Sequence, residues 1–171
     1  GDHHKVQVFD KNGTLVSTIG TSASTDAGKF YHNYGIAFDA AGKLHVACRN
    51  NHRIQHFEQN GTLLGTIGSY GSQNVDPYDF TITDQKTYLV ADVEGDRIIE
   101  FDGNGSVVKT IGSRGSNTGQ MNNPRSIIEH NGVIYVADGT NHRVLAFDRN
   151  GTHLFEFGGS GSGAGQFNQP Y

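Results

Sequence analysis

The feature that most constrains this chain is a segment that recurs four times at intervals of about 46 residues. Its copies read HHKVQVFDKNGTLVSTIG, NHRIQHFEQNGTLLGTIG, GDRIIEFDGNGSVVKTIG and NHRVLAFDRNGTHLFEFG. The shared phenylalanines Phe9, Phe57, Phe101 and Phe147 lie 48, 44 and 46 residues apart. Self-similarity at a fixed period of this length indicates a repeat architecture in which each unit packs on the next.

Each unit is expected to contain four β-strands. Apolar residues alternate with polar ones in short runs, and an Asn-Gly pair separates the last two runs in every copy. Asn-Gly is the strongest short hairpin signal, because both residues tolerate positive φ. Ala41-Gly42 and Asn131-Gly132 suit the first hairpin in the same way. In the first full unit we expect strands over 36–38, 44–47, 53–57 and 62–67, with later first strands over 80–82 and 127–128.

A four-stranded antiparallel meander that repeats without helical periodicity predicts an all-β fold, the β-propeller. The high glycine content, 24 of 171 residues, fits many short strands joined by tight turns. We expect one array with a partial blade over 1–27, blades over 28–72, 73–118 and 119–162, and the start of another blade over 163–171. The chain would then hold about three and a half blades, and we expect it to be an excerpt of a longer polypeptide. The alternative is self-association through open blade edges.

Composition narrows the classes of function. The net charge of −4 argues against a surface that grips nucleic acid all over, because such domains are usually basic. The single cysteine, Cys48, excludes an intrachain disulfide framework, and its place at a strand end predicts an inert, half-buried thiol. No apolar run approaches the length of a membrane span, so no membrane insertion is expected.

The segments VADGTNHRVLAFDRNG, RNNHRIQHFEQNG and GAGQFNQP resemble the NHL repeat, which is named for its Asn-His-Leu signature. The resemblance recurs in every copy. The chain is similar to the NHL domains of animal tripartite-motif (TRIM-NHL) proteins. Bacterial sensor and secreted proteins also carry such arrays. The resemblance implies a ring of six blades and a non-catalytic scaffold for protein–protein interaction.

Acidic and basic residues recur at the same places in the units. Asp92 and Asp138 end second strands, whereas Arg97 and Arg143 begin third strands. Strand–loop–strand geometry would bring each pair together, so we predict a structural ion pair in each of these blades. Cys48 stands at the corresponding position of the first full blade, so Arg53 needs another partner there.

Nine histidines raise the hypothesis of a metal site. His4, His52 and His142 share one repeat position, which favours a scaffold role. No histidine or cysteine cluster with ligand spacing occurs, and no nucleophile elbow, phosphate loop or dinucleotide fingerprint is present. We therefore expect no catalytic residue, no metal and no cofactor. The peptide-amidating lyases, which are similar propellers with zinc-binding histidines, remain a remote metal-dependent alternative.

The Asn-Gly turns are also N-glycosylation sequons, at Asn12, Asn60, Asn104 and Asn150. The favoured explanation for these triplets is a hairpin turn that simply prefers Asn-Gly-Thr. The sequence leaves the compartment open, leaning towards the cytoplasm, and glycosylation would place the protein outside the cell.

The resemblance implies that one face is formed by the lead-ins to the first strands and by the loops between second and third strands. The residues expected there are Tyr34, Arg49, Asn50, Tyr78, Glu94, Arg125, Thr140 and Tyr171. Tyrosine and arginine combine contact area with directional hydrogen bonds, which suits partner binding. Binding of a protein partner is therefore the expected function.

Two alternatives remain for this face. Single-stranded RNA binding needs basic residues beside stacking aromatics, and Glu94, Asp76 and Asp79 interrupt such a cluster. An extracellular, glycosylated structural or adhesive array is the other.

Overall fold

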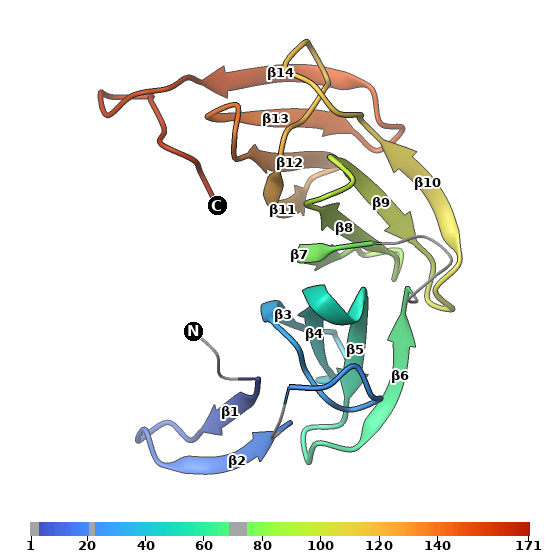
Figure 1. Cartoon of the computed structure of the whole chain (residues 1–171). Helices are drawn as coiled ribbons and strands as arrows, with labels where there is room; N and C mark the ends of the chain where they lie inside the picture. Colours follow the sequence, from blue (N-terminus) through green and yellow to red (C-terminus); the bar gives the residue numbers. More distant parts are fainter. Residues whose placement is uncertain (1–3, 21–22, 69–74) are drawn as a thin grey trace.

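The computed structural model describes residues 4–20, 23–68 and 75–171, and in them it has fourteen strands in four antiparallel sheets (Figure 1). The two-stranded sheet contains β1 (Val6–Phe9) and β2 (Leu15–Ile19). The first full sheet contains β3 (Asn33–Phe38), β4 (Leu44–Cys48), β5 (Arg53–Phe57) and β6 (Leu63–Ile67), with a short 3-10 helix, η1 (Arg49–Asn51), between β4 and β5.

The second full sheet contains β7 (Pro77–Ile82), β8 (Tyr88–Asp92), β9 (Arg97–Phe101) and β10 (Val107–Ile111). The third contains β11 (Pro124–His130), β12 (Val133–Asp138), β13 (Arg143–Asp148) and β14 (His153–Gly158). Within every sheet each strand pairs with the next strand of the chain. The predicted all-β propeller fold with four-stranded antiparallel blades is therefore confirmed. In the described part of the chain, no helix has the length and apolar character to cross a membrane.

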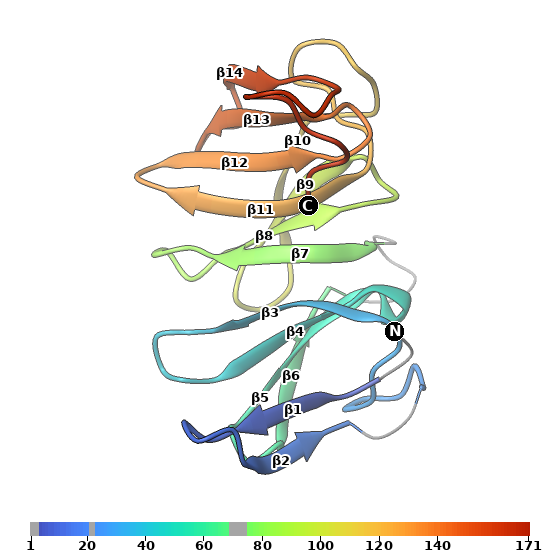
Figure 2. The same ribbon diagram turned by 90° about the vertical axis from the view of Figure 1, so that its left-hand side faces the viewer.

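The sheets fan around an open centre, towards which the C-terminal segment points (Figure 1). Strands β3, β7 and β11 are innermost and run side by side when this open side faces the viewer (Figure 2). The two-stranded sheet follows in the same fan beside the first full blade. The boundary expected between residues 72 and 73 lies outside the described residues.

The first strands are longer than their apolar runs predicted. Where the sequence predicted strands over 36–38 and 127–128, the structure has β3 from Asn33 and β11 from Pro124 to His130. Polar and proline residues at the start of these strands carry no apolar alternation, although register irregularities let them pair with the ends of β4 and β12.

The Asn-Gly turns differ in type from the prediction. At Asp10–Thr14 only Gly13 has positive φ, +82°, and the N–H of Gly13 donates to the carbonyl of Asp10. Each such turn is a three-residue hairpin loop closed by a glycine in the left-handed region, rather than a two-residue turn. The Asp10 carboxylate accepts the N–H groups of Asn12 and Thr14, which stabilises this longer loop. Only Asn131-Gly132, with φ of 51° and 79°, has both residues at positive φ as expected.

The hydrophobic core lies between the sheets. One cluster joins the second and third full blades around Leu89, Met121 and Phe147, and two others fill the preceding gaps between blades. A glycine at the end of each last strand makes room for this packing. A Cβ on Gly112 would lie 2.3 Å from Cε of Met121, and its φ is +77°.

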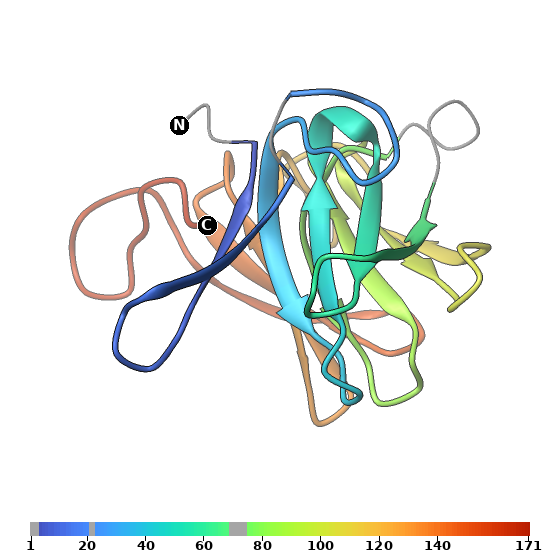
Figure 3. The same ribbon diagram turned by 90° about the horizontal axis from the view of Figure 1, so that it is seen from below.

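The fan has two faces that differ in their loops. Seen from below, η1 lies on one side and the hairpin turns on the other (Figure 3). We call the side with η1, the lead-ins and the β4–β5, β8–β9 and β12–β13 loops the upper face. The side that carries the hairpin turns, including that between β3 and β4, is the lower face.

Candidate functional site on the upper face

Backbone hydrogen bonds fix the upper-face loops to the lead-ins. The N–H of Arg49 donates to the carbonyl of His32 over 2.9 Å. In the next two blades the N–H of Val93 donates to the carbonyl of Asp76 over 3.1 Å, and the N–H of Thr140 donates to the carbonyl of Asn122 over 3.0 Å. The two loop types that were expected to form one face are therefore one connected surface.

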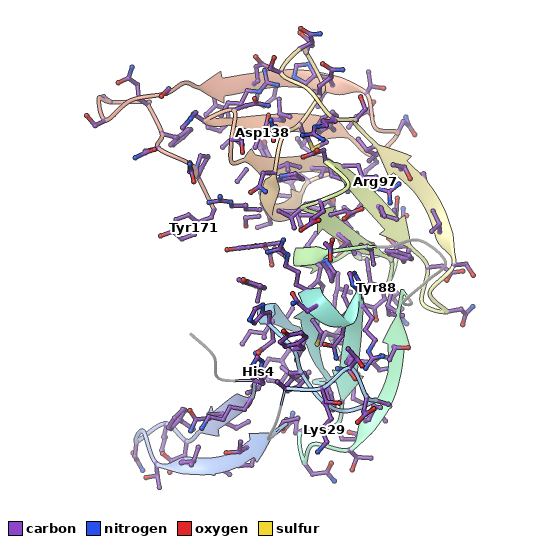
Figure 4. All side chains as sticks on the ribbon, in the orientation of Figure 1. His4, Lys29, Tyr88, Arg97, Asp138 and Tyr171 are labelled. Atoms are coloured by element: carbon purple, nitrogen blue, oxygen red, sulfur yellow. The ribbon has the colours of Figure 1, made fainter. Side chains whose placement is uncertain are left out.

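The histidine of the repeat joins neighbouring blades. Nδ1 of His4 accepts the N–H of His32 over 3.3 Å, and Nδ1 of His142 accepts the N–H of Gln169 over 3.1 Å. His4 lies on the side of its sheet that faces the next blade (Figure 4). This geometry gives these histidines a scaffold role.

Two other residues occupy the same repeat position. Oδ1 of Asp96 accepts the N–H of Asn123 over 2.7 Å, so a carboxylate replaces the imidazole there. Nδ1 of His52 lies 2.9 Å from Oδ1 of Asp76. Among residues 4–20, 23–68 and 75–171, no three His, Cys, Asp or Glu side chains form a group that could hold a metal ion.

Two aspartate–arginine pairs lie inside their blades. Nε of Arg97 is 2.8 Å from Oδ2 of Asp92, and Nε of Arg143 is 3.0 Å from Oδ2 of Asp138 (both blades are seen in Figure 4). Both carboxylates are fully buried, and that of Asp138 also accepts the N–H of Asn122 over 2.7 Å. These pairs hold the lead-ins in place below the surface.

In the first full blade, where Cys48 replaces the aspartate, Arg53 and Cys48 have other partners. Arg53 donates through Nη2 to the carbonyls of Thr25 and Asp26. Nε2 of Gln55 donates to Sγ of Cys48 over 3.4 Å, and its Oε1 accepts the N–H of Gly28. Burial raises the pKa of the Cys48 thiol to about 11, with the Gln55 hydrogen bond lowering it only partly.

Four residues at one repeat position form a row along the inner wall. The rings of Tyr34 and Tyr78 stack with centroids 4.2 Å apart at 25°. Arg125 and Tyr171 continue the row, and all four line one hollow of about 220 Å³. Tyr171 is 85% exposed and points towards the open centre (Figure 4).

A larger hollow of about 810 Å³ lies beside η1 on the same face. Arg49 crosses it to pair with Glu94 of the next blade, with Nη2 2.7 Å from Oε1. Asn50 also lines it. Burial raises the pKa of Asp76, and the neighbouring His52 opposes this shift.

The sequence placed Arg49, Asn50 and Glu94 on this surface, with Asp76 as an interruption of its basic cluster. The lining residues that it did not single out for this face are Thr25, Tyr31, His32 and His52. A signal was available, because Tyr31 and His32 lie in the same lead-in as Tyr34. Thr140 is exposed on the loop between β12 and β13 and lines neither hollow.

The residues of the sequons are exposed. Asn12, Asn60, Asn104 and Asn150 all lie in turns of the lower face, away from the hollows of the upper face. In three of these turns, the preceding aspartate rather than the asparagine side chain accepts the backbone N–H groups.

Comparison with solved structures identifies the class of fold. The chain is similar to virginiamycin B lyase from Staphylococcus aureus, with 15% identity and a TM-score of 0.67 over 91% of this chain and 48% of the lyase. A streptogramin B lyase structure gives 16% identity and a TM-score of 0.66, over 90% and 47% of the two chains. The chain thus spans about half the length of these lyases. The class is the β-propeller, and at this identity the likeness concerns the fold alone.

Hydrazine synthase from Kuenenia stuttgartiensis shares the fold over 76% of this chain and 36% of its own, with 14% identity and a TM-score of 0.60. No protein-family model and no curated protein matches the sequence. The structures of similar fold therefore support a propeller and do not single out the TRIM-NHL group.

The expectation that the chain is not an enzyme is overturned by these comparisons. The propellers of similar fold include lyases and a synthase. The expectation was drawn from the absence of short catalytic motifs in the sequence. Propellers collect side chains from several blades, so a local motif is not needed for a catalytic site and its absence is a poor guide.

Proposed function

We propose that the chain belongs to an NHL-type propeller whose upper face binds an extended segment of a partner protein. The carrying observation is the row of Tyr34, Tyr78, Arg125 and Tyr171, because these equivalent positions of successive blades line one hollow. A row of aromatic and guanidinium groups from successive blades matches a chain that crosses several blades. The histidine links between blades support the NHL resemblance.

The charges beside the row favour a protein segment over single-stranded RNA. Arg49 is paired with Glu94, and Asp76 and Asp79 lie beside the tyrosines. Oδ2 of Asp79 accepts the hydroxyl of Ser126 from the next blade, so this carboxylate is fixed at the wall. A phosphate backbone would meet these carboxylates, whereas peptide amides are uncharged and can use them as acceptors.

The test is selection from a library of immobilised nine-residue peptides, followed by measurement of affinity for the selected peptides. Removing a central aromatic or arginine contact is expected to weaken binding about tenfold or more. The variants are Tyr78→Ala, Arg125→Ala and Tyr171→Ala. The side chain of Tyr171 is exposed, so its truncation leaves the packed core unchanged.

Leu154→Ala is the matched control, because Leu154 is also exposed but lies on the outer strand β14. Its affinity should equal that of the unsubstituted chain. Equal binding by the three row variants would overturn the proposal. Tighter binding of U9 or A9 oligonucleotides than of any selected peptide would also overturn it and would favour RNA.

A further inference from the structure

The lower face carries a second hollow that is separate from the upper-face site. It has a volume of about 580 Å³ and lies between the hairpin that joins β3 to β4 and the one that joins β7 to β8. This volume is within the range of small-molecule sites. The residues that matter for its chemistry are Phe38, Asp39, Ile82, Asp84, Lys86 and Tyr88.

Lys86 has an unusual backbone conformation at the edge of this hollow. Its φ is 61°, and its turn has the hydrogen bonds of the glycine-closed hairpins, with Thr83 N–H donating to Thr87 and Lys86 N–H donating to Thr83. At this position the five other hairpins of this form have glycine, namely Gly13, Gly42, Gly61, Gly105 and Gly151. A lysine in the left-handed region destabilises the fold relative to glycine. Within the described residues Lys86 forms no ion pair, so its ammonium gives the turn no stabilising partner.

A chain of polar groups, which runs from half-buried Asp39 through buried His45, leads to Tyr88 at the wall of the hollow. Nε2 of His45 lies 3.4 Å from Oδ2 of Asp39, and Nδ1 of His45 lies 3.4 Å from the Tyr88 hydroxyl. His45 is 1% exposed, and burial lowers its pKa, so the imidazole is neutral near pH 7.

A neutral imidazole has one donor nitrogen and one acceptor nitrogen. The carboxylate of Asp39 can only accept, so Nε2–H of His45 donates to it and Nδ1 accepts from Tyr88. With its hydrogen given to His45, the oxygen of Tyr88 acts as an acceptor towards a molecule in the hollow.

The hollow therefore offers three kinds of contact. Tyr88, Asp39 and Asp84 supply acceptor oxygens, and Lys86 supplies a cationic donor. Phe38, which is 62% exposed, lies with Ile82 on the same hollow and supplies apolar surface. The complement is a small molecule with an ammonium group, a carboxylate and an apolar body.

We propose that the lower-face hollow binds a zwitterionic small molecule of the amino-acid class with an apolar side chain. Its carboxylate would pair with Lys86, its ammonium would bind Tyr88 and Asp84, and its side chain would contact Phe38 and Ile82. Glycine at position 86 would suit the backbone conformation better, but it would remove the ammonium that pairs with the carboxylate of the ligand. This site is independent of the partner-binding row on the upper face.

The test is calorimetric titration of the chain with L-phenylalanine. Saturable binding is expected. Phenethylamine and 3-phenylpropionate each lack one charged group, so their affinities should be lower than that of L-phenylalanine by about tenfold or more. If either analogue binds as well as L-phenylalanine, or if L-phenylalanine does not bind, the proposal is overturned.

Lys86→Gly separates binding from folding. It should raise the midpoint of thermal unfolding, because glycine tolerates this φ, and should weaken L-phenylalanine binding about tenfold or more. Asn131→Gly is the matched control: Asn131 is an exposed hairpin residue at φ 51° outside the hollow. Its binding should equal that of the unsubstituted chain. Undiminished binding by Lys86→Gly would overturn the proposal even if its stability rises.

Discussion

Asp138 and Arg143 face each other across the turn between β12 and β13, with Oδ2 and Nε 3.0 Å apart. The carboxylate is fully buried and also accepts a backbone N–H of the lead-in. The pair thus joins the interior of a blade to the upper face. The Asn141 side-chain amide also donates to this carboxylate. Removing the carboxylate takes the acceptor from the N–H of Asn122, whereas Arg143 still pairs with Glu156 and donates to the carbonyls of Asn117 and Gln120.

Replacing Asp138 by alanine is expected to lower the free energy of unfolding by about 1–3 kcal/mol, because a buried N–H loses its acceptor while Arg143 keeps its pair with Glu156. Urea unfolding followed by circular dichroism measures this change. Asp26→Asn, an exposed carboxylate, is the control and should change stability by less than about 0.5 kcal/mol. An unchanged urea midpoint for Asp138→Ala would show that the pair does not hold the blade.

The Asp92–Arg97 and Asp138–Arg143 geometry was predictable because each pair recurs at a fixed distance along the chain. The propeller was predictable for the same reason, since the period gave the unit and the Asn-Gly turns gave its last hairpin. The turn type was not, because the effect of Asp10 on the loop depends on its side-chain hydrogen bonds.

The candidate site was only partly predictable. Its row of tyrosines follows from one repeat position, but the larger hollow joins residues from different blades and different repeat positions, such as Thr25, His32 and Glu94. The lower-face hollow could not be predicted from the sequence, because Tyr88 and His45 lie 43 residues apart and meet only where their sheets pack together.

Cys48 is expected to resist thiol reagents in the native state. It is fully buried, and its raised pKa of about 11 leaves almost no thiolate at pH 8. Ellman's reagent should therefore react at the rate of unfolding, and quickly in urea. Rapid reaction without denaturant would mean that the blade opens locally around β4.

Gly112→Ala should destabilise the junction between the second and third full blades. Its φ of +77° disfavours alanine, and the new Cβ would meet Met121, so we expect a loss of about 1–3 kcal/mol in the free energy of unfolding. Gly103→Ala is the comparison, because its nearest neighbour for a Cβ is the carbonyl of Lys86 at 3.8 Å. Equal effects in the two variants would contradict the packing account of the closing glycines.

Buried His45 and half-buried His56 should make the fold less stable in mild acid. Burial lowers the pKa of His45 and of His56, whose rings stack 5.3 Å apart. In the unfolded chain both protonate near their ordinary pKa of about 6.5, so below that pH the unfolded state binds more protons than the folded state. Stability therefore falls as pH is lowered through this region, until the pH reaches the lower pKa of the folded state.

The groups that face His45 are Asp39 on its hairpin, His56 on β5 and Tyr88 on β8. The pKa of Asp39 is lowered despite burial, by hydrogen bonds from Lys43 and His45, so its own contribution is lost only in stronger acid. Between pH 7 and 5.5 the histidines thus dominate the change, with an upper slope of about 1.4 kcal/mol per pH unit for each.

Urea unfolding at several pH values in this range tests the effect. In His45→Gln the slope of unfolding free energy against pH should fall, and His130→Gln, at an exposed position, should keep it. The slope carries the test because glutamine also changes the packing, and with it the absolute stability. A full slope in His45→Gln would assign the acid sensitivity to His56 or to other groups, and would contradict a neutral, acceptor His45 behind Tyr88.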